Sequence, residues 1–119
     1  MKYMLLVYLD EKALSETERE ECYRDSAQLA QDLSASGHYV DASPLHLTST
    51  ATSVRVRNGK RLVTDGPFAE TREQLGGYFL VDAKDLDEAT DIAARVPIAR
   101  VGTVEVRPVM GIPGLPTEG

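Results

Sequence analysis

One loop carries the residues most capable of chemistry, the run DGPFAETREQLGGYF from Asp65 to Phe79. It holds three acidic side chains, and two of them, Asp65 and Glu70, lie on either side of the aromatic Phe68. A partly buried carboxyl group can act as a general acid or base because burial changes its pKa. We therefore predict Asp65 as a catalytic acid or base beneath Phe68, with Glu70 as its helper.

Each acidic residue also has an interpretation without chemistry. Asp65 precedes Gly66 and Pro67, so its carboxylate could accept backbone N–H bonds two residues on, in an Asx turn. Glu70 could make a structural hydrogen bond or be solvated. The two carboxylates could also hold a cation, but no histidine or cysteine stands nearby at metal-ligand spacing, so we predict no metal site.

The glycine pair Gly76-Gly77 directly precedes an apolar strand. Phosphate-binding loops instead place their glycines after a strand and before a helix. We therefore interpret the pair as a feature that lets the strand begin with close backbone contacts, and we predict no cofactor.

Four further residues are candidate substrate contacts: Phe68, Tyr78, Arg107 and His38. Tyr78 could direct its hydroxyl into a cavity or a dimer interface, or lie in the core. Arg107, on the polar side of the last strand, could bind an anion or form an ion pair. His38 follows Gly37 at a helix end, where the helix dipole favours a cation, so a structural role is the alternative.

The chain begins with a continuous apolar run, Tyr3–Leu9, which predicts a central strand covered on both faces. Ser15 and Glu18 then form an S-x-x-E capping box, and a helix should follow as far as Gly37. On that helix Cys22, the only cysteine, belongs to an apolar stripe and is expected to be a small buried residue rather than a reactive thiol.

The second half repeats this pattern after an extended connection and a hairpin. Asn58-Gly59 is the pair that a type I′ turn requires between two short strands. The remaining elements are a strand, a helix capped by Asp85 and a last strand in which Pro108 suits a sheet edge. Their expected ranges are 38–43 for the second strand, 44–53 for the connection, 54–57 and 60–64 for the hairpin, 77–82 for the next strand, 85–96 for the helix and 103–109 for the last strand.

This order predicts an α+β fold, a ferredoxin-like βαββαβ unit with an inserted β-hairpin and both helices on one sheet face. We expect one domain over residues 1–110 and a flexible tail over residues 111–119. Two helices cover only one face of the apolar central strands, so a second copy should cover the other. The sequence therefore predicts a homodimer packed through its sheet faces.

Net charge and hydropathy limit the classes of partner and the location that we expect for this protein. The formal charge of −6 is unsuited to direct binding of nucleic acid. No apolar run approaches the roughly 20 residues that cross a membrane, and MKYMLLVYL is followed by acidic residues rather than a cleavage site. We expect a cytoplasmic protein.

The run DGPFAETREQLGGYF, followed by DLDEATDIAARVP and GTVEVRPV, resembles the DGPF branch of the YCII-related family, and the likeness extends from KYMLLVY to EVRPVM. The resemblance implies a dimeric ferredoxin-like α+β barrel. Some members of the family group resemble small enzymes, including a dehydrochlorinase-type lyase, and DGPF members are often linked with extracytoplasmic-function sigma factors. Short YciI-type members carry a histidine in the first helix that is proposed to pair with an aspartate. Residues 15–36 contain no histidine here, and Tyr23 and Arg24 occupy the comparable region.

Three hypotheses for function follow. The first is an acid–base enzyme, or a binder, for an unknown small molecule, with a cleft between the sheet face and the DGPF loop. The second is a non-catalytic interaction or regulatory module whose partner is a sigma factor. The third is a dimeric scaffold in which the loop only closes the structure.

Overall fold

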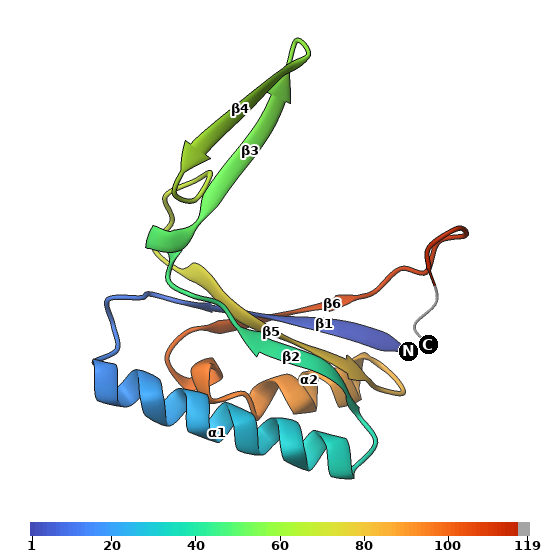
Figure 1. Cartoon of the computed structure of the whole chain (residues 1–119). Coiled ribbons are helices and arrows are strands. Elements are labelled where there is room, and N and C mark those ends of the chain that lie inside the picture. The colour runs from blue at the N-terminus through green and yellow to red at the C-terminus, as the bar shows by residue number, and fades with distance from the viewer. Residues whose placement is uncertain (117–119) are drawn as a thin grey trace.

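The computed structural model describes residues 1–116, which form a four-stranded antiparallel sheet with two helices against one face (Figure 1). The sheet has the order β2-β5-β1-β6, so β1 and β5 are central. This is the predicted ferredoxin-like α+β arrangement, and Pro108 lies on the edge strand as expected. The bounds of these elements are β1 Lys2–Leu9, α1 Glu16–Ala35, β2 Tyr39–Pro44, β5 Gln74–Asp82, α2 Leu86–Ala94 and β6 Thr103–Pro108.

Side-chain caps fix where both helices begin. At α1 the Glu18 N–H donates to the Ser15 hydroxyl at 3.1 Å, and the Ser15 N–H donates to the Glu18 carboxylate at 3.0 Å. The predicted capping box is therefore confirmed. At α2 the Glu88 N–H donates to the Asp85 carboxylate at 2.9 Å. After α1 the chain turns at Gly37, whose φ of 82° is easily adopted only by glycine.

The core lies between the sheet and the helices. Alternate residues of β1 point into it, and those between them point to the opposite face. The fully buried core side chains come mainly from the two central strands, the two helices and the turn after α2, while the edge strands add the half-buried Ala42, Val104 and Val106. The largest buried side chains are Tyr3, Leu5, Val7, Leu9, Leu29, Leu33, Phe79, Val81, Ile92, Val96 and Ile98.

Within residues 1–116, no helix lies over the other side of the sheet, which we call the open face (Figure 1). Its central strands are apolar there too, as the sequence predicts, with half-buried side chains at Met4, Leu6, Tyr8 and Leu80. The expected second apolar face is thus present on a single chain.

Strands β3, Thr52–Arg57, and β4, Lys60–Asp65, pair only with each other, in a separate two-stranded sheet. Their turn has positive φ at Asn58 (52°) and Gly59 (74°), as a type I′ turn requires. The hairpin stands away from the two layers and rises on the open-face side, as does the segment after β6 (Figure 1).

Most elements lie within two residues of their expected bounds, and two differences affect the path of the chain. The connection over residues 44–53 is not extended throughout, because it contains the 3₁₀ turn η1, Thr48–Thr50, and β3 already begins at Thr52. Strand β5 begins at Gln74 rather than Gly77, since a register shift against β1 lets the chain keep pairing past the glycines. A second 3₁₀ turn, η2 Pro97–Arg100, follows α2.

The predicted tail over residues 111–119 is only partly described, since residues 117–119 lie outside the described range. Within residues 1–116, neither helix has the length and hydropathy needed to cross a membrane.

Candidate functional site

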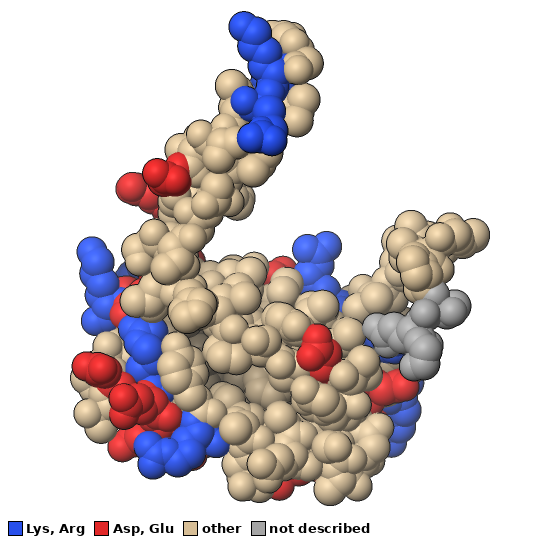
Figure 2. Space-filling view, viewed as in Figure 1, with Lys and Arg blue, Asp and Glu red and all other residues tan. Residues whose placement is uncertain are grey.

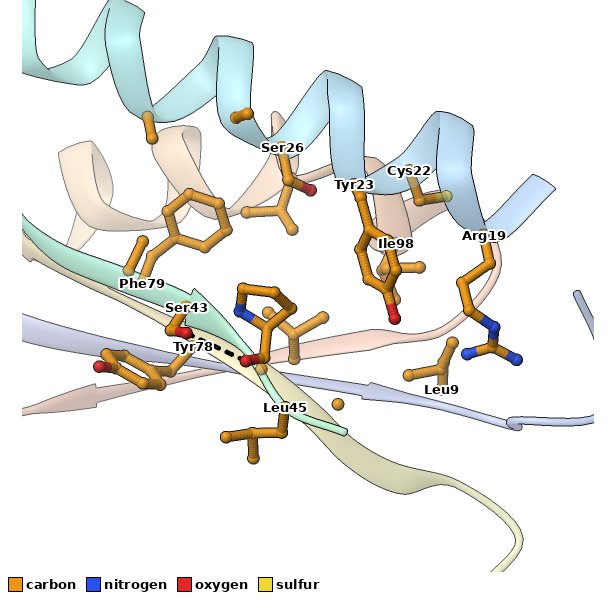
Figure 3. A pocket seen from close by; sticks show the side chains of 18 of the residues that line it. Leu9, Arg19, Cys22, Tyr23, Ser26, Ser43, Leu45, Tyr78, Phe79 and Ile98 are labelled. Carbon is orange, nitrogen blue, oxygen red and sulfur yellow. Dashed lines mark hydrogen bonds between the residues drawn. The ribbon is translucent and has the colours of Figure 1, made fainter. Parts of the chain in front are cut away.

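A cavity of about 420 Å³ lies between the first half of α1 and the sheet (Figure 3). We call it the α1 cleft. Most of its surface is apolar, and it opens beside the end of β2. The side chains that shape it come from α1 on one side and from the sheet and η2 on the other, and they include Arg19, Cys22, Tyr23, Ser26, Leu9, Pro44, Phe79 and Ile98.

The cleft follows from a change of side-chain size along α1. Leu29 and Leu33 fill the space under the second half of the helix and are buried. One and two turns earlier, the same face carries the smaller Ser26 and Cys22. These side chains fill less of the space above the sheet, so a cavity remains between the first half of α1 and Phe79.

Two charged residues line the cleft, Arg19 and Glu11, and Figure 3 shows the Arg19 side chain at its rim. The Arg19 Nη2 donates to the backbone carbonyl of Glu11 at 2.8 Å. The Glu11 carboxylate accepts instead from Thr48, from the hydroxyl at 2.6 Å and from the N–H at 2.9 Å. Within residues 1–116, no carboxylate forms an ion pair with Arg19. Its guanidinium therefore keeps donors that can bind an anion in the cleft.

Cys22 lies half-buried in the wall of the cleft. Burial raises the pKa of its thiol, and the carboxylates of Asp25, Glu21 and Glu18 raise it further. The thiol therefore remains protonated at neutral pH, which agrees with the expectation that Cys22 is not a reactive nucleophile. Beside it, Tyr23 and Ser26 direct their hydroxyls toward the cavity (Figure 3).

Gly77 permits the close packing that forms the floor of the cleft. A Cβ atom at this position would lie 2.9 Å from the Ser43 carbonyl oxygen and 3.1 Å from the Cα of Pro44. The glycine therefore lets the end of β2 approach β5, and this approach places Pro44 against the cavity. The close backbone contact expected of the glycine pair agrees with this geometry, but the pair lies inside β5 rather than where the strand begins, because β5 starts at Gln74.

Residues 65–75 of the DGPF loop lie outside the α1 cleft, whereas Gly76, Gly77, Tyr78 and Phe79 line it. Within residues 1–116 the Asp65 carboxylate makes no hydrogen bond; the Gly66 N–H donates to the Ala51 carbonyl at 2.7 Å, and the Ser53 hydroxyl donates to the Gly66 carbonyl at 2.8 Å. Phe68 is 80% exposed and does not cover Asp65. In a single chain this corner faces solvent.

Glu70 lines a shallower, more polar groove between the loop and η1. Asp65 is not among the residues that line this groove, so the two predicted acids do not share a cavity in one chain. Within residues 1–116, no three His, Cys, Asp or Glu side chains are grouped to hold a metal ion.

Tyr78 and Arg107 lie on the open face. The Tyr78 hydroxyl donates to Asp41 Oδ2 at 2.8 Å, and this hydrogen bond raises the pKa of Tyr78. Tyr78 is among the residues that line the α1 cleft, but its ring points away from the cavity (Figure 3). Arg107 lies opposite Met4 on the edge strand and forms no ion pair within residues 1–116.

His38 links the two helices rather than lining a cavity. Its Nε2 lies 3.1 Å from Glu88 Oε1, and its Nδ1 lies 2.7 Å from the Ser36 hydroxyl. This geometry fits the structural alternative for His38. The six predicted site residues thus do not gather in one site, since Asp65 and Phe68 lie at the DGPF corner and Tyr78 and Arg107 on the open face. Their roles stay predictions.

Sequence reasoning did not identify Arg19 or Ser26 as site residues. A signal was present for Ser26, because it interrupts an apolar stripe with a small polar side chain. No local pattern marks Arg19, because its position at the rim depends on how far α1 stands from the sheet.

Nearly the whole chain matches one family of known proteins. The family described as "YCII-related domain" matches residues 1–113. A protein of Rhizobium meliloti (strain 1021), named as uncharacterized, is 39% identical over 114 residues, which cover 92% of this chain and 92% of the relative.

Proposed function

The chain belongs to the YCII-related domain family, and from the geometry of the α1 cleft we propose that it binds a small, mostly apolar organic molecule with an anionic group. The apolar body would lie between α1 and the sheet, and the anionic group would face Arg19. We place this function in a cytoplasmic protein, as the sequence suggests.

The cavity itself carries this proposal. Binding sites for small molecules are concave, mostly apolar and about 300–1,000 Å³ in volume, with a few polar groups that orient the ligand. The α1 cleft has a volume of about 420 Å³, an apolar floor at Leu9 and Phe79, and polar groups at Arg19 and Ser26. Arg19 selects an anion because its guanidinium offers several donors without a carboxylate partner.

We propose binding rather than turnover in this cleft. Asp65 and Glu70, the residues predicted to act as acid and base, lie on a different part of the surface, and neither lines the cleft. Within residues 1–116, no structural feature specifically supports the alternative in which the protein binds a sigma factor.

A fluorescence titration with 1-anilinonaphthalene-8-sulfonate, an apolar anion, tests the proposal. The variant Ser26→Leu fills the cavity and should weaken binding about tenfold or more, which corresponds to about 1.4 kcal/mol. Ser34→Leu makes the same change on an exposed position of α1 and should leave binding unchanged. Arg19→Met should weaken binding about tenfold, since it removes a charge-assisted hydrogen bond.

Equal affinity of the wild type and Ser26→Leu for the probe would overturn the proposed site. Weak binding by Ser26→Leu with undiminished binding by Arg19→Met would keep the cavity but remove the anion from the proposal.

We also propose that a second copy covers the open face, as the sequence suggests. The half-buried side chains of Met4, Leu6 and Leu80 form an apolar surface without a helix over it. Sedimentation velocity should give the mass of two chains, and Leu80→Lys should give that of one. A wild type that sediments as a single chain at high concentration would contradict this pairing.

A further inference from the structure

We propose that the β3–β4 hairpin, Thr52–Asp65, is an arm that binds a second copy of this chain through the face formed by Val54, Val56 and Val63. This inference concerns a surface distant from the α1 cleft. It requires the pairing of two chains but not the proposed ligand.

The strand register separates the arm into two unlike faces. Val54 lies directly opposite Val63, and Val56 lies two residues further along on the same face, opposite Arg61. The other face carries Arg55 opposite Leu62, and Arg57 opposite Lys60. The arm therefore has one face with three valines beside Arg61, and another face without a valine that carries Arg55, Arg57 and Lys60.

The valine face is exposed to solvent in the part of the chain that the structure describes. Val54, Val56 and Val63 are 60%, 63% and 53% exposed. The arm pairs with no strand of the main sheet. An isolated two-stranded hairpin is at best marginally stable in water and needs an apolar surface to pack against. Exposed valines on such a hairpin indicate that this surface is supplied by another chain.

Charge favours a second copy as that chain. Of the 13 basic and 19 acidic residues, the arm contains 4 basic and 1 acidic, a net charge of +3. The remaining 9 basic and 18 acidic residues give the rest of the chain −9. Figure 2 shows the basic side chains gathered on the outer half of the arm. A basic arm is attracted to the acidic body of a second copy, whereas that body repels a nucleic acid.

The length of the arm suits this contact. Each strand has 6 residues and so spans about 20 Å, while two sheets packed face to face lie about 10 Å apart. The arm rises on the open-face side (Figure 1). With a second sheet on the open face, the arm extends past that sheet along its flank. Its basic tip then lies on the side of the second copy's helices, where α1 contains six acidic and two basic residues, Glu16, Glu18, Glu20, Glu21, Asp25, Asp32, Arg19 and Arg24.

Two matched variants of the full chain test the arm in sedimentation velocity. Val63→Lys places a charge on the valine face, and Leu62→Lys places the same charge on the neighbouring residue of the opposite face. Leu62 is 47% exposed and Val63 is 53% exposed, so the two positions are comparable. We expect the dimer dissociation constant to rise at least tenfold for Val63→Lys and to change less than about threefold for Leu62→Lys.

A more conservative variant distinguishes loss of the dimer contact from misfolding of the arm. Val63→Thr keeps the β-branched shape that strands favour and should also raise the dissociation constant, with an unchanged circular dichroism spectrum. Equal dissociation constants for Val63→Lys and Leu62→Lys, whether as low as the wild type's or raised alike, would overturn the assignment of the valine face. A monomeric wild type would overturn the arm and the sheet pairing together, without affecting the ligand proposal.

Discussion

At the scale of single residues, the hydrogen bond from Tyr78 to Asp41 should be visible in a titration. This bond favours the protonated phenol and raises the pKa of Tyr78. Its contribution to stability is therefore present below the ordinary tyrosine pKa and is lost as the pH rises through the raised value in the folded state.

The ultraviolet absorbance of tyrosinate, measured against pH, checks this. Subtracting the titration curve of Tyr78→Phe from that of the wild type isolates the titration of Tyr78. In Asp41→Ala the same difference should shift to lower pH, because the acceptor is gone. An unshifted difference titration in Asp41→Ala would show that the bond does not hold the proton.

Cys22 gives a second measurement at this scale. The carboxylate of Asp25 contributes to the raised pKa of the thiol, so Asp25→Asn should lower that pKa and speed reaction with a disulfide reagent at fixed pH. Glu16 lies on the same helix, but its charge does not contribute to the raised pKa of this thiol. Glu16→Gln should therefore leave the rate of the thiol reaction unchanged. Equal rates in the two variants would mean that the local carboxylates do not control Cys22.

At the scale of elements, the cap of α1 should be measurable on its own. Ser15→Ala removes the acceptor for the Glu18 N–H and should cost about 1 kcal/mol of unfolding free energy. Ser34→Ala, an exposed position on the same helix, is the control. Urea denaturation measures both.

The cost of losing the cap should also depend on pH. The hydrogen bonds of the cap lower the pKa of Glu18 from 4.5. Their contribution is present above that value and is lost as the pH falls through the lowered one. The difference between wild type and Ser15→Ala should therefore shrink in acid, and a difference independent of pH would contradict the role of Glu18.

Gly77 tests how β2 and β5 shape the cleft. In Gly77→Ala the added methyl group would lie too close to the backbone of Ser43 and Pro44, so the chain should lose about 1–3 kcal/mol of unfolding free energy. Gly111→Ala adds a methyl group with no atom within 4 Å and should be neutral. Thermal unfolding compares the two, and equal melting temperatures would show that β2 moves freely away from β5.

At the scale of the whole molecule, local signals were sufficient to predict the fold. The Ser15–Glu18 box, the Asn58-Gly59 turn and the apolar run of β1 each act within a few residues, and the structure has all three. The position of the α1 cleft was not predictable in this way. It depends on the distance between α1 and the sheet, which Phe79, Pro44 and the small side chains of α1 set together.

The DGPF loop has a strong local sequence pattern, but the pattern did not predict how the loop packs. Its dense pattern of Asp65, Pro67 and Glu70 indicated a site, but the pattern by itself could not show what covers it. In one chain Phe68 points into solvent and the acids lie apart. Composition reports which groups a loop contains, whereas a site depends on tertiary contacts, and here any cover for this corner would have to come from another molecule.

The central claim is that a small apolar anion binds between α1 and the sheet, and Cys22 reports on that place because it is the only cysteine and lies in the wall of the cleft. The decisive measurement is the rate of Cys22 modification by a disulfide reagent with and without saturating 1-anilinonaphthalene-8-sulfonate. Occupation of the cleft should slow the reaction at least severalfold in the wild type and much less in Ser26→Leu. An unchanged rate with the probe bound would contradict the account.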